Sequence, residues 1–361
     1  MNKMELRYQK LRAKMEELGL DAIYVNSPEN HLFVTDFDNP DGWAFVTREK
    51  AWIYADSRYI EAAKAEATSL CEVCLPGKPA IGELVAEYGL HVIGYEDRRL
   101  TCSSFESFKK GIADKGNEGV EYAPVGGLFT ELRSIKTPDE VENIVAAQRI
   151  AEKAFDHIVS VLRHDMTEIE VAAELEYIMK KNGSEKPSFD TIAVSGSASS
   201  RPHGVPRPVK LENGFLTMDY GAMVNGYHSD MTRTVVIGKA DPDIRRLYET
   251  VLKAQNAAID AITEGAKNAD MDKIAREIID GAGYEGKFSH SLGHGVGLEI
   301  HEAPGLSGSA GDAVLIPGQI VTVEPGIYLE GQYGCRIEDM ILVTPGGHRN
   351  LTECPKELIE L

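Results

Sequence analysis

The sequence has no excess of basic residues and no long apolar run. Its 38 Lys and Arg face 57 Asp and Glu, which gives a formal net charge of −19 at pH 7. This balance argues against binding to nucleic acid or to an anionic membrane surface, because both attract basic patches. No stretch approaches the roughly 20 apolar residues of a membrane-spanning helix. The first residues, MNKMELRYQK, are charged and lack the apolar centre of a signal peptide.

Cysteine is scarce, with five residues in a chain of 361. Cys71 and Cys74 form a CxxC pair, but no second pair and no downstream histidine pair accompanies it. A lone CxxC is weak evidence for zinc binding or redox chemistry, so we expect two ordinary buried or half-buried thiols. Scattered cysteines, odd in number, fit a reducing compartment, and we expect a cytoplasmic protein.

The length of 361 residues predicts two domains, each able to bury its own core. Up to about residue 120, helical and strand-like patterns alternate, which is typical of an α/β domain. They include an amphipathic helix over 3–19 and a hairpin with strands at 43–46 and 51–54. We expect an N-terminal domain over 1–125 and a C-terminal domain over 130–361.

The C-terminal domain is predicted to hold two pairs of helices and a curved antiparallel sheet. Two capping boxes, Thr137 with Glu140 and Thr167 with Glu170, begin the first two helices. Two further helices are expected between 242 and 281, the second beginning near Met271. Strand-like patterns make up most of the remainder.

Residues 215–234, FLTMDYGAMVNGYHSDMTRT, predict a strand, a glycine-containing turn and a second strand. Asp219 follows an apolar run, and Asp230 shares a strand face with Thr232 at i+2. A hairpin that brings Asp219 near Asp230 is unfavourable unless a cation neutralises the two charges. A divalent metal, which prefers oxygen ligands, is the favoured interpretation. The alternative is that one or both Asp residues cap turns or face solvent.

Three downstream segments favour the metal: SLGHGVGLEIHE at 291–302, VTVEPG at 321–326 and GCRIEDM at 334–340. The candidate ligands, in chain order, are Asp219, Asp230, His294, Glu324 and Glu338. Four carboxylates and one imidazole can hold two divalent ions about 3.5–4 Å apart, with a water or hydroxide between them.

These segments, in this order and spacing, resemble the aminopeptidase P and prolidase family of pita-bread metallopeptidases. The matching motifs are MDYGAMVNGYHSDMTRT, GHGVGLEIHEAP, TVEPGIY and RIED. The resemblance implies an α+β protein in which an α/β creatinase-type domain precedes a pita-bread domain. It also implies two divalent ions, usually Mn²⁺, with Co²⁺ or Zn²⁺ suited to the same ligands. Asp219 would serve one ion, Asp230 and Glu338 would bridge both, and His294 and Glu324 would complete the second.

The resemblance also implies catalytic roles around the metals. Glu324 would additionally carry a proton from the attacking water to the leaving nitrogen. His301 would hydrogen-bond the substrate or the tetrahedral oxyanion, and His203 would stabilise the transition state. Independently of the resemblance, Arg336 precedes Glu338 by two residues and shares its strand face, so we expect it to orient a ligand carboxylate. For His203 the alternative is an ordinary surface-loop residue.

The implied reaction is hydrolysis of the bond between an N-terminal residue and a following proline, a bond that general peptidases handle poorly. We expect an Xaa-Pro aminopeptidase; the alternative is an Xaa-Pro dipeptidase, or prolidase, which shares every motif quoted. A non-catalytic pita-bread binding protein is disfavoured because all five ligand positions are intact. The expected partner is a small peptide with proline second. In this family the N-terminal domain narrows access to the site and helps a homodimer form.

Some positions depart from the family pattern, and others are expected only to support the site. Asp36 replaces a glycine that relatives often carry, which leaves the local turn open. His228 and Cys335 replace residues that are usually small and aliphatic, respectively. We favour a packing or supporting role for His228 over metal ligation. Tyr227 and Thr232 are expected to support the metal ligands.

Overall fold

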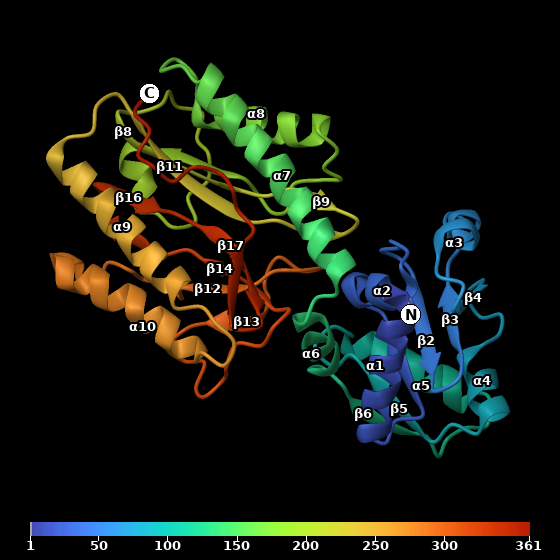
Figure 1. Cartoon of the computed structure of the whole chain (residues 1–361). Helices are drawn as coiled ribbons and strands as arrows, with labels where there is room; N and C mark the ends of the chain where they lie inside the picture. The colour runs from blue at the N-terminus through green and yellow to red at the C-terminus, as the bar shows by residue number, and fades with distance from the viewer. Residues whose placement is uncertain (1) are drawn as a thin grey trace. The chain divides into compact units, whose positions relative to one another are not determined.

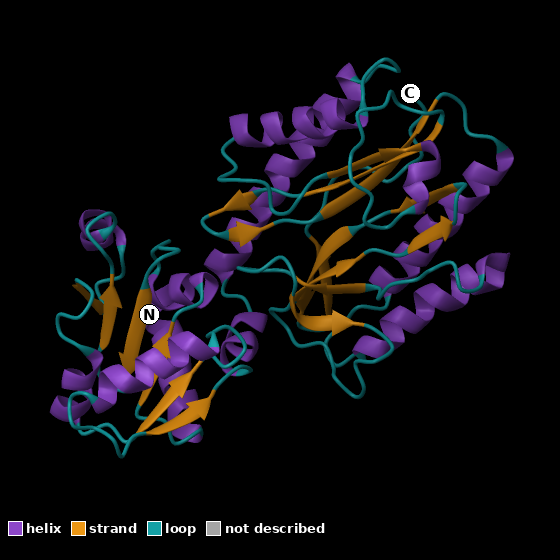
Figure 2. Ribbon diagram, turned by 180° about the vertical axis from the view of Figure 1, so that it is seen from behind, coloured by secondary structure: helices purple, strands orange, loops and turns teal. Residues whose placement is uncertain are grey.

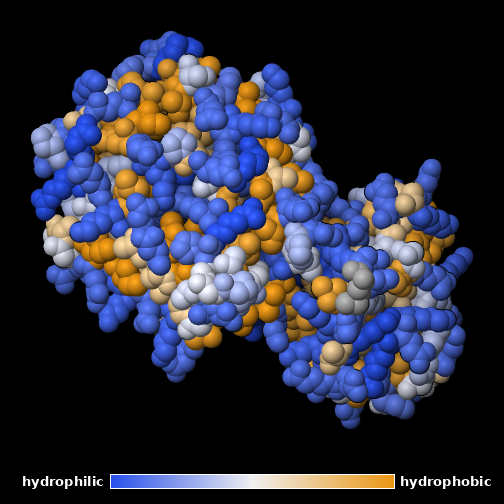
Figure 3. Space-filling model, in the orientation of Figure 1, coloured by the Kyte–Doolittle hydropathy of each residue, from blue (hydrophilic) through white to orange (hydrophobic). Residues whose placement is uncertain are grey.

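The computed structural model describes residues 2–361, and the chain divides into two compact units after Arg133. In Figure 1 the first unit runs from blue to teal and the second from green to red. Apolar and hydrophilic residues are interspersed on the face of each unit shown in Figure 3. Within the described residues, none of the helices combines the length and apolar character needed to cross a bilayer.

The first unit contains one six-stranded sheet with the strand order β4-β3-β2-β1-β5-β6. The strands are β1 (Ala22–Val25), β2 (Trp43–Thr47), β3 (Ala51–Tyr54), β4 (Cys71–Cys74), β5 (Val92–Tyr95) and β6 (Glu121–Pro124). The helices are α1 (Lys3–Glu17), α2 (Pro28–Thr35), α3 (Ile60–Glu66), α4 (Ile81–Tyr88), α5 (Cys102–Ala113) and α6 (Leu128–Ser134). The predicted hairpin is confirmed, since β2 pairs antiparallel with β3.

Two local predictions in the first unit are resolved by the structure. Asp36 ends α2 in the left-handed conformation, with φ 54°. Aspartate is one of the few residues besides glycine that tolerates this region, so the turn forms without the glycine. Cys71 is half-buried and Cys74 is buried, and both are free thiols, as predicted.

The second unit begins with two helices, α7 (Pro138–Val161) and α8 (Glu168–Lys181), and later adds α9 (Pro242–Asp260) and α10 (Asn268–Ile279). Both predicted capping boxes are present. The predicted start of α10 at Met271 is wrong by three residues. Lys267, at its N-cap, makes no capping side-chain bond, so the sequence carried no start signal there.

The strands of the second unit form two main sheets between the helix pairs, as Figure 2 shows from behind. The first has the order β11-β8-β7, from β7 (Ile192–Ser195), β8 (Gly214–Tyr220) and β11 (Met231–Ile237). The second has the order β13-β12-β14-β17-β18, from β12 (Gly293–Gly295), β13 (Glu302–Leu306), β14 (Ile320–Val323), β17 (Asp339–Thr344) and β18 (Gly347–Asn350). Two hairpins complete the unit: β9 (Met223–Val224) with β10 (Tyr227–His228), and β15 (Gly326–Leu329) with β16 (Tyr333–Arg336).

Alternation along β8 and β11 divides their side chains between two cores. Leu216 and Met218 of β8 pack in the same core as residues of α7 and α8. Phe215 of β8 and Val236 of β11 pack with residues of α9 and α10. Asp219 is four residues after Phe215, and Asp230 is six residues before Val236, so each shares the strand face of that residue. The two acids therefore project toward the same side of the sheet.

Candidate metal centre

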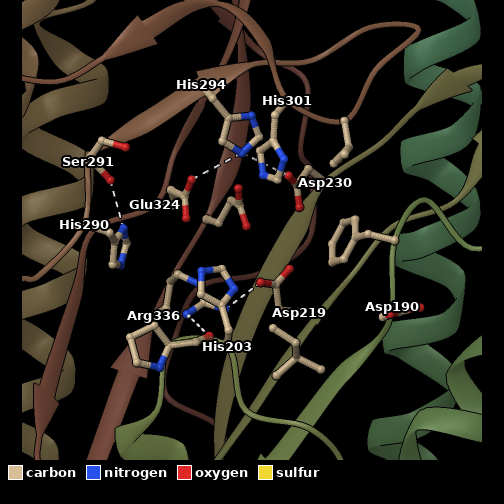
Figure 4. Close-up of a pocket in the computed structure, with 15 residues that line it drawn as sticks. Asp190, His203, Asp219, Asp230, His290, Ser291, His294, His301, Glu324 and Arg336 are labelled. Atoms are coloured by element: carbon tan, nitrogen blue, oxygen red, sulfur yellow. Dashed lines mark hydrogen bonds and ion pairs between the residues drawn. The ribbon is translucent and has the colours of Figure 1, made fainter. Parts of the chain in front are cut away.

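A cavity of about 470 Å³ lies in the second unit. Its walls hold all eight predicted site residues and seven others: Phe189, Asp190, Ile192, Pro202, His203, Asp219, Asp230, His290, Ser291, His294, Ile300, His301, Glu324, Arg336 and Glu338. Figure 4 shows His294, His301, Glu324 and Asp230 facing His203, Arg336 and Asp219 across it.

Strand pairing places the two aspartates predicted from the central hairpin. Asp219 stands opposite Thr232 in the antiparallel pair of β8 and β11. Asp230 precedes β11 by one residue and shares the face of Thr232. Between the two strands, Asn225 and Gly226 both have positive φ, 50° and 76°, and turn the small hairpin of β9 and β10. The turn is therefore longer than the simple one predicted.

Asp230, His294 and Glu338 bring one ligand atom each within 4.8 Å of one another. His294 lies on β12, and its Nδ1 is 3.0 Å from the carbonyl oxygen of Gly295. Since a carbonyl oxygen only accepts, Nδ1 carries the proton and Nε2 keeps its lone pair. That Nε2 is 3.5 Å from Asp230 Oδ2 and 3.4 Å from Glu324 Oε1. Burial lowers the pKa of His294 to about 4, which keeps the imidazole neutral and able to bind a metal.

The acids of this cluster are buried close together. Burial raises the pKa of Asp230 well above its ordinary value, and the charges of Asp219 and Glu324 raise it further. Burial also raises the pKa of Glu338, and the charges of Asp230 and Glu324 raise it further. Burial raises the pKa of Glu324 to about 8. Such a set of like charges is unfavourable without a compensating cation.

Arg336 connects Asp219 to Glu338 through Thr232 of β11. Its NH2 donates to Asp219 Oδ2 at 2.5 Å, and its Nε donates to the hydroxyl of Thr232 at 3.0 Å. Thr232 in turn donates to Glu338 Oε2 at 2.8 Å. Arg336 and Thr232 thus fix the orientation of two carboxylates.

A second chain of contacts runs from Arg336 to His290. Arg336 NH1 donates to the hydroxyl of Tyr328 at 2.8 Å, so that hydroxyl proton is free for His290 Nε2, 2.9 Å away. His290 Nδ1 is 2.9 Å from the carbonyl of Ser291 and donates to it. This chain fixes both the position and the tautomer of His290 at the cavity wall.

The residues present fit divalent metal ions. Asp219 Oδ1 is buried and has no hydrogen-bond partner among the described residues, although its other oxygen is bound by Arg336. A buried carboxylate oxygen without a donor is costly, and a cation would satisfy it. The donors are carboxylate oxygens and one imidazole nitrogen, which suit Mn²⁺, Co²⁺ or Zn²⁺.

His203 and His301 both line the cavity, so the structure gives His203 a position at the site. The ring of His301 lies 4.3 Å from that of His294, edge to face. Burial lowers the pKa of His301. His203 lies on the long segment between β7 and β8. Its neighbour Pro202 is held by Arg336, whose NH1 donates to the Pro202 carbonyl at 3.2 Å.

Sequence reasoning missed several lining residues, including His290, Phe189 and Ile300. His290 immediately precedes the SLGHG motif, but a single histidine outside a motif carries little signal. Tyr328 lies inside the TVEPGIY motif, and its contact with Arg336 depends on the pairing of β15 with β16.

The structure also places His228, Cys335 and Tyr227. His228 is half-buried and its Nδ1 is 2.9 Å from the hydroxyl of Ser188, which agrees with a packing role. Cys335 is fully buried in the core beside α9 and α10. Tyr227 donates its hydroxyl to Glu140 on α7 at 2.8 Å, a different contact from the metal-supporting one expected.

The sequence matches two known protein-family models. Residues 142–345 match the profile of metallopeptidase family M24, and residues 7–135 match the creatinase/prolidase N-terminal domain. The chain belongs to metallopeptidase family M24. The predicted α+β fold, a creatinase-type domain followed by a pita-bread domain, is thereby confirmed.

Similar proteins match along nearly their whole length. An Xaa-Pro dipeptidase of Pyrococcus furiosus is 39% identical over 358 residues, covering 99% of this chain and 100% of that protein. The structure of an Xaa-Pro dipeptidase from Bacillus anthracis has a TM-score of 0.93 at 39% identity, with both chains fully covered. That of an X-Pro aminopeptidase from Thermotoga maritima has a TM-score of 0.89 at 32% identity, covering 96% of this chain and 100% of that one.

Proposed function

We propose that this family M24 protein is a metal-dependent peptidase that hydrolyses Xaa-Pro dipeptides. The carrying observation is the convergence of Asp230, His294 and Glu338 within 4.8 Å inside a cavity lined by three more histidines. The names of the Pyrococcus furiosus and Bacillus anthracis relatives support the dipeptide substrate. They favour the prolidase alternative over the aminopeptidase expected from the sequence.

The cavity has room and chemistry for a small peptide. Its volume of about 470 Å³ lies in the range of small-molecule sites. Phe189, Ile192 and Ile300 supply apolar lining, while the carboxylates supply negative charge. An apolar side chain and the proline ring of a substrate would contact the apolar lining, and the free N-terminal ammonium would be attracted to the carboxylates.

Five residues are proposed to hold two divalent ions: Asp219, Asp230, His294, Glu324 and Glu338. When bound, these ions would polarise the scissile carbonyl and lower the pKa of the attacking water. Mn²⁺ is the proposed metal, with Co²⁺ or Zn²⁺ as alternatives.

The protein side chains would position the reactants and move the proton. Glu324 accepts the proton of the attacking water and delivers it to the proline nitrogen as the bond breaks. His203 and His301 donate hydrogen bonds to the oxygen that gains negative charge. Arg336 holds Asp219 in its orientation throughout, because its guanidinium cannot be deprotonated.

An Xaa-Pro aminopeptidase is the second candidate, and one feature of the cavity favours it. Among the described lining residues, Arg336 is the single Lys or Arg, and its NH2 is already 2.5 Å from Asp219. A dipeptide presents a C-terminal carboxylate near the reacting bond, which a dedicated dipeptidase would pair with a cation. A longer peptide carries that carboxylate elsewhere.

The test is a substrate screen on protein reconstituted with Mn²⁺, Co²⁺ or Zn²⁺. Leu-Pro, Leu-Pro-Gly and Leu-Gly are compared at equal concentration, with release of free leucine measured. We expect rapid cleavage of Leu-Pro, slower cleavage of Leu-Pro-Gly and little cleavage of Leu-Gly. Faster cleavage of Leu-Pro-Gly than of Leu-Pro would transfer the assignment to the aminopeptidase. Cleavage of neither proline peptide by protein carrying two ions would contradict both candidates.

A further inference from the structure

Glu168 has a contact pattern that its place at the start of a helix does not require. It is the first residue of α8, and its side chain is fully buried. The cap of α8 is already supplied by Thr167 and Glu170, each bonding the other's backbone N–H. The carboxylate of Glu168 is therefore free to bind elsewhere in the fold.

That carboxylate accepts five hydrogen bonds from two residues. Ser195 donates its backbone N–H to Oε1 at 2.7 Å and its hydroxyl to the same oxygen at 2.9 Å. Arg207 donates its backbone N–H and its Nε to Oε2 at 2.9 and 2.8 Å, and its NH2 to Oε1 at 2.6 Å. The side-chain part is a two-pronged guanidinium–carboxylate pair, the strongest common form of such bonds.

Ser195 and Arg207 bound a loop, 195–207, that makes up the first part of the segment between β7 and β8. Ser195 is the last residue of β7, and Arg207 follows twelve positions later, where its NH2 also approaches the Ser195 carbonyl at 3.3 Å. Pro202 and His203 lie between them, and both line the metal-site cavity. Glu168 thus closes the base of the loop that carries His203.

The middle of the loop makes further hydrogen bonds with strand β16, which carries Arg336. Arg336 donates to the Pro202 carbonyl at 3.2 Å, and Gly334 donates its backbone N–H to the Ser199 hydroxyl at 3.0 Å. Fixing both ends of a loop restricts its backbone, so fewer conformations compete with the one in which His203 faces the cavity. A misplacement of about 1 Å at a reacting group can cost roughly 100-fold in rate.

We propose that Glu168 and Arg207 are positioning residues, which clamp the loop 195–207 and thereby hold His203 against the substrate. This inference rests on the proposed function, in which His203 donates to the developing oxyanion. Neither residue is among those that line the cavity. Their effect on the reaction passes through the loop.

The first test is kinetic and uses the full-length, metal-loaded protein. Arg207→Met removes the paired guanidinium and leaves the buried Glu168 carboxylate without it, so the double variant Glu168→Gln/Arg207→Met is measured beside it and circular dichroism checks that both are folded. We expect kcat for Leu-Pro to fall about 10–100-fold with KM and metal content nearly unchanged. Arg207→Lys, which keeps the charge but not the two-pronged geometry, should give an intermediate loss. Arg163→Met, which removes an exposed arginine bound to Asp165 just before α8, is the matched control and should leave kcat unchanged.

A double-variant cycle separates positioning from a general structural effect. In a His203→Ala background, Arg207→Met should cost little further activity, because the side chain that it positions is gone. The same fold-loss in both backgrounds would overturn the proposal. An equal loss from the Arg163→Met control would overturn it as well.

A second measurement does not depend on activity. Hydrogen exchange of the backbone amides in 196–205 should be faster in Arg207→Met than in wild type or Arg163→Met, with α7 and α9 unchanged. Unchanged exchange in this loop would refute the clamp. If the wild-type protein cleaves no Xaa-Pro peptide, the proposed function fails, and the exchange result alone still decides whether the clamp exists.

Discussion

Lys136 and Glu302 form a buried ion pair, although they are 166 positions apart, with Nζ 2.6 Å from Oε1. Their side chains are only 1% and 2% exposed. Glu302 begins β13 and stands opposite Gly295 of β12. The pair therefore supports the two strands next to His294 and His301, whose rings contact each other.

Removing the lysine of this pair is predicted to destabilise the second unit. Lys136→Met removes the cation that lies 2.6 Å from the buried Glu302 carboxylate, and breaking a buried ion pair from one side costs about 3–5 kcal/mol. The double variant Lys136→Met/Glu302→Gln should recover part of the loss. Both tryptophans, Trp43 and Trp52, lie in the first unit, so unfolding in urea is best followed by circular dichroism.

Lys239→Met is the control for that measurement. Lys239 is 89% exposed and pairs with Glu360 at 3.0 Å, so its removal should cost less than about 1 kcal/mol. A loss for Lys136→Met no larger than this control would show that the buried pair does not stabilise the unit.

Asp230→Asn is predicted to abolish peptidase activity and to lower metal content while the protein stays folded. The substitution removes the negative oxygen that is proposed to bridge two ions. Elemental analysis of reconstituted protein measures the metal directly, and a chelator should abolish wild-type activity. Asp190→Asn, which also lines the cavity, should keep its metal. Two ions per chain in Asp230→Asn would rule out the bridging role.

His203→Ala is predicted to retain both metal ions and to slow turnover by roughly 10²–10⁴, the range for lost acid–base or oxyanion assistance. Steady-state kinetics on Leu-Pro and elemental analysis are measured on the same preparation. His157→Ala, which removes a histidine paired with Glu174 at 2.7 Å on the first helix pair, is the control and should keep wild-type turnover. Loss of metal from His203→Ala would place this histidine among the ligands.

A free N-terminal amine is predicted to be necessary for cleavage. Acetylation removes the ammonium that the acidic cavity attracts, so acetyl-Leu-Pro should be cleaved at least about tenfold more slowly than Leu-Pro, as expected for one lost charged hydrogen bond. Comparison of kcat/KM for the two peptides is the measurement. Equal values would contradict an exopeptidase that recognises the N-terminus.

Glu168 is predicted to contribute to stability only while it is ionised. Burial raises the pKa of Glu168, but hydrogen bonds from Arg207 and Ser195 outweigh this and hold it below its ordinary 4.5. A depressed folded-state pKa stabilises the protein above pH 4.5, and the contribution is lost as the pH falls through the folded value. The urea midpoint of wild type should therefore drop more between pH 7 and pH 3.5 than that of Glu168→Gln. Parallel curves would contradict this.

Two predictions from the sequence concern the N-terminal domain: that it helps a homodimer form and that it narrows access to the site. Homodimer formation can be measured by light scattering, and a role in narrowing access can be measured by activity on longer Xaa-Pro peptides. The cytoplasmic location also stays a prediction.

Local patterns determined much of the fold. The capping boxes at Thr137 and Thr167 marked two helix starts because a cap involves only residues within one turn. Alternation along β8 and β11 placed Asp219 and Asp230 on one side because strand side chains have a period of two. The motif set identified the five candidate ligands and the family without any coordinates.

Only the tertiary structure decided how those residues are held. Arg336 reaches Asp219 across 117 positions, and Glu168 closes its loop on Arg207 across 39. Such contacts depend on strand register and on which helix packs against which sheet, and no local periodicity encodes either. His290, too, acquired its place at the cavity wall through Tyr328 and Arg336. The sequence thus determined which chemical groups the site contains, and packing between distant segments determined their orientation.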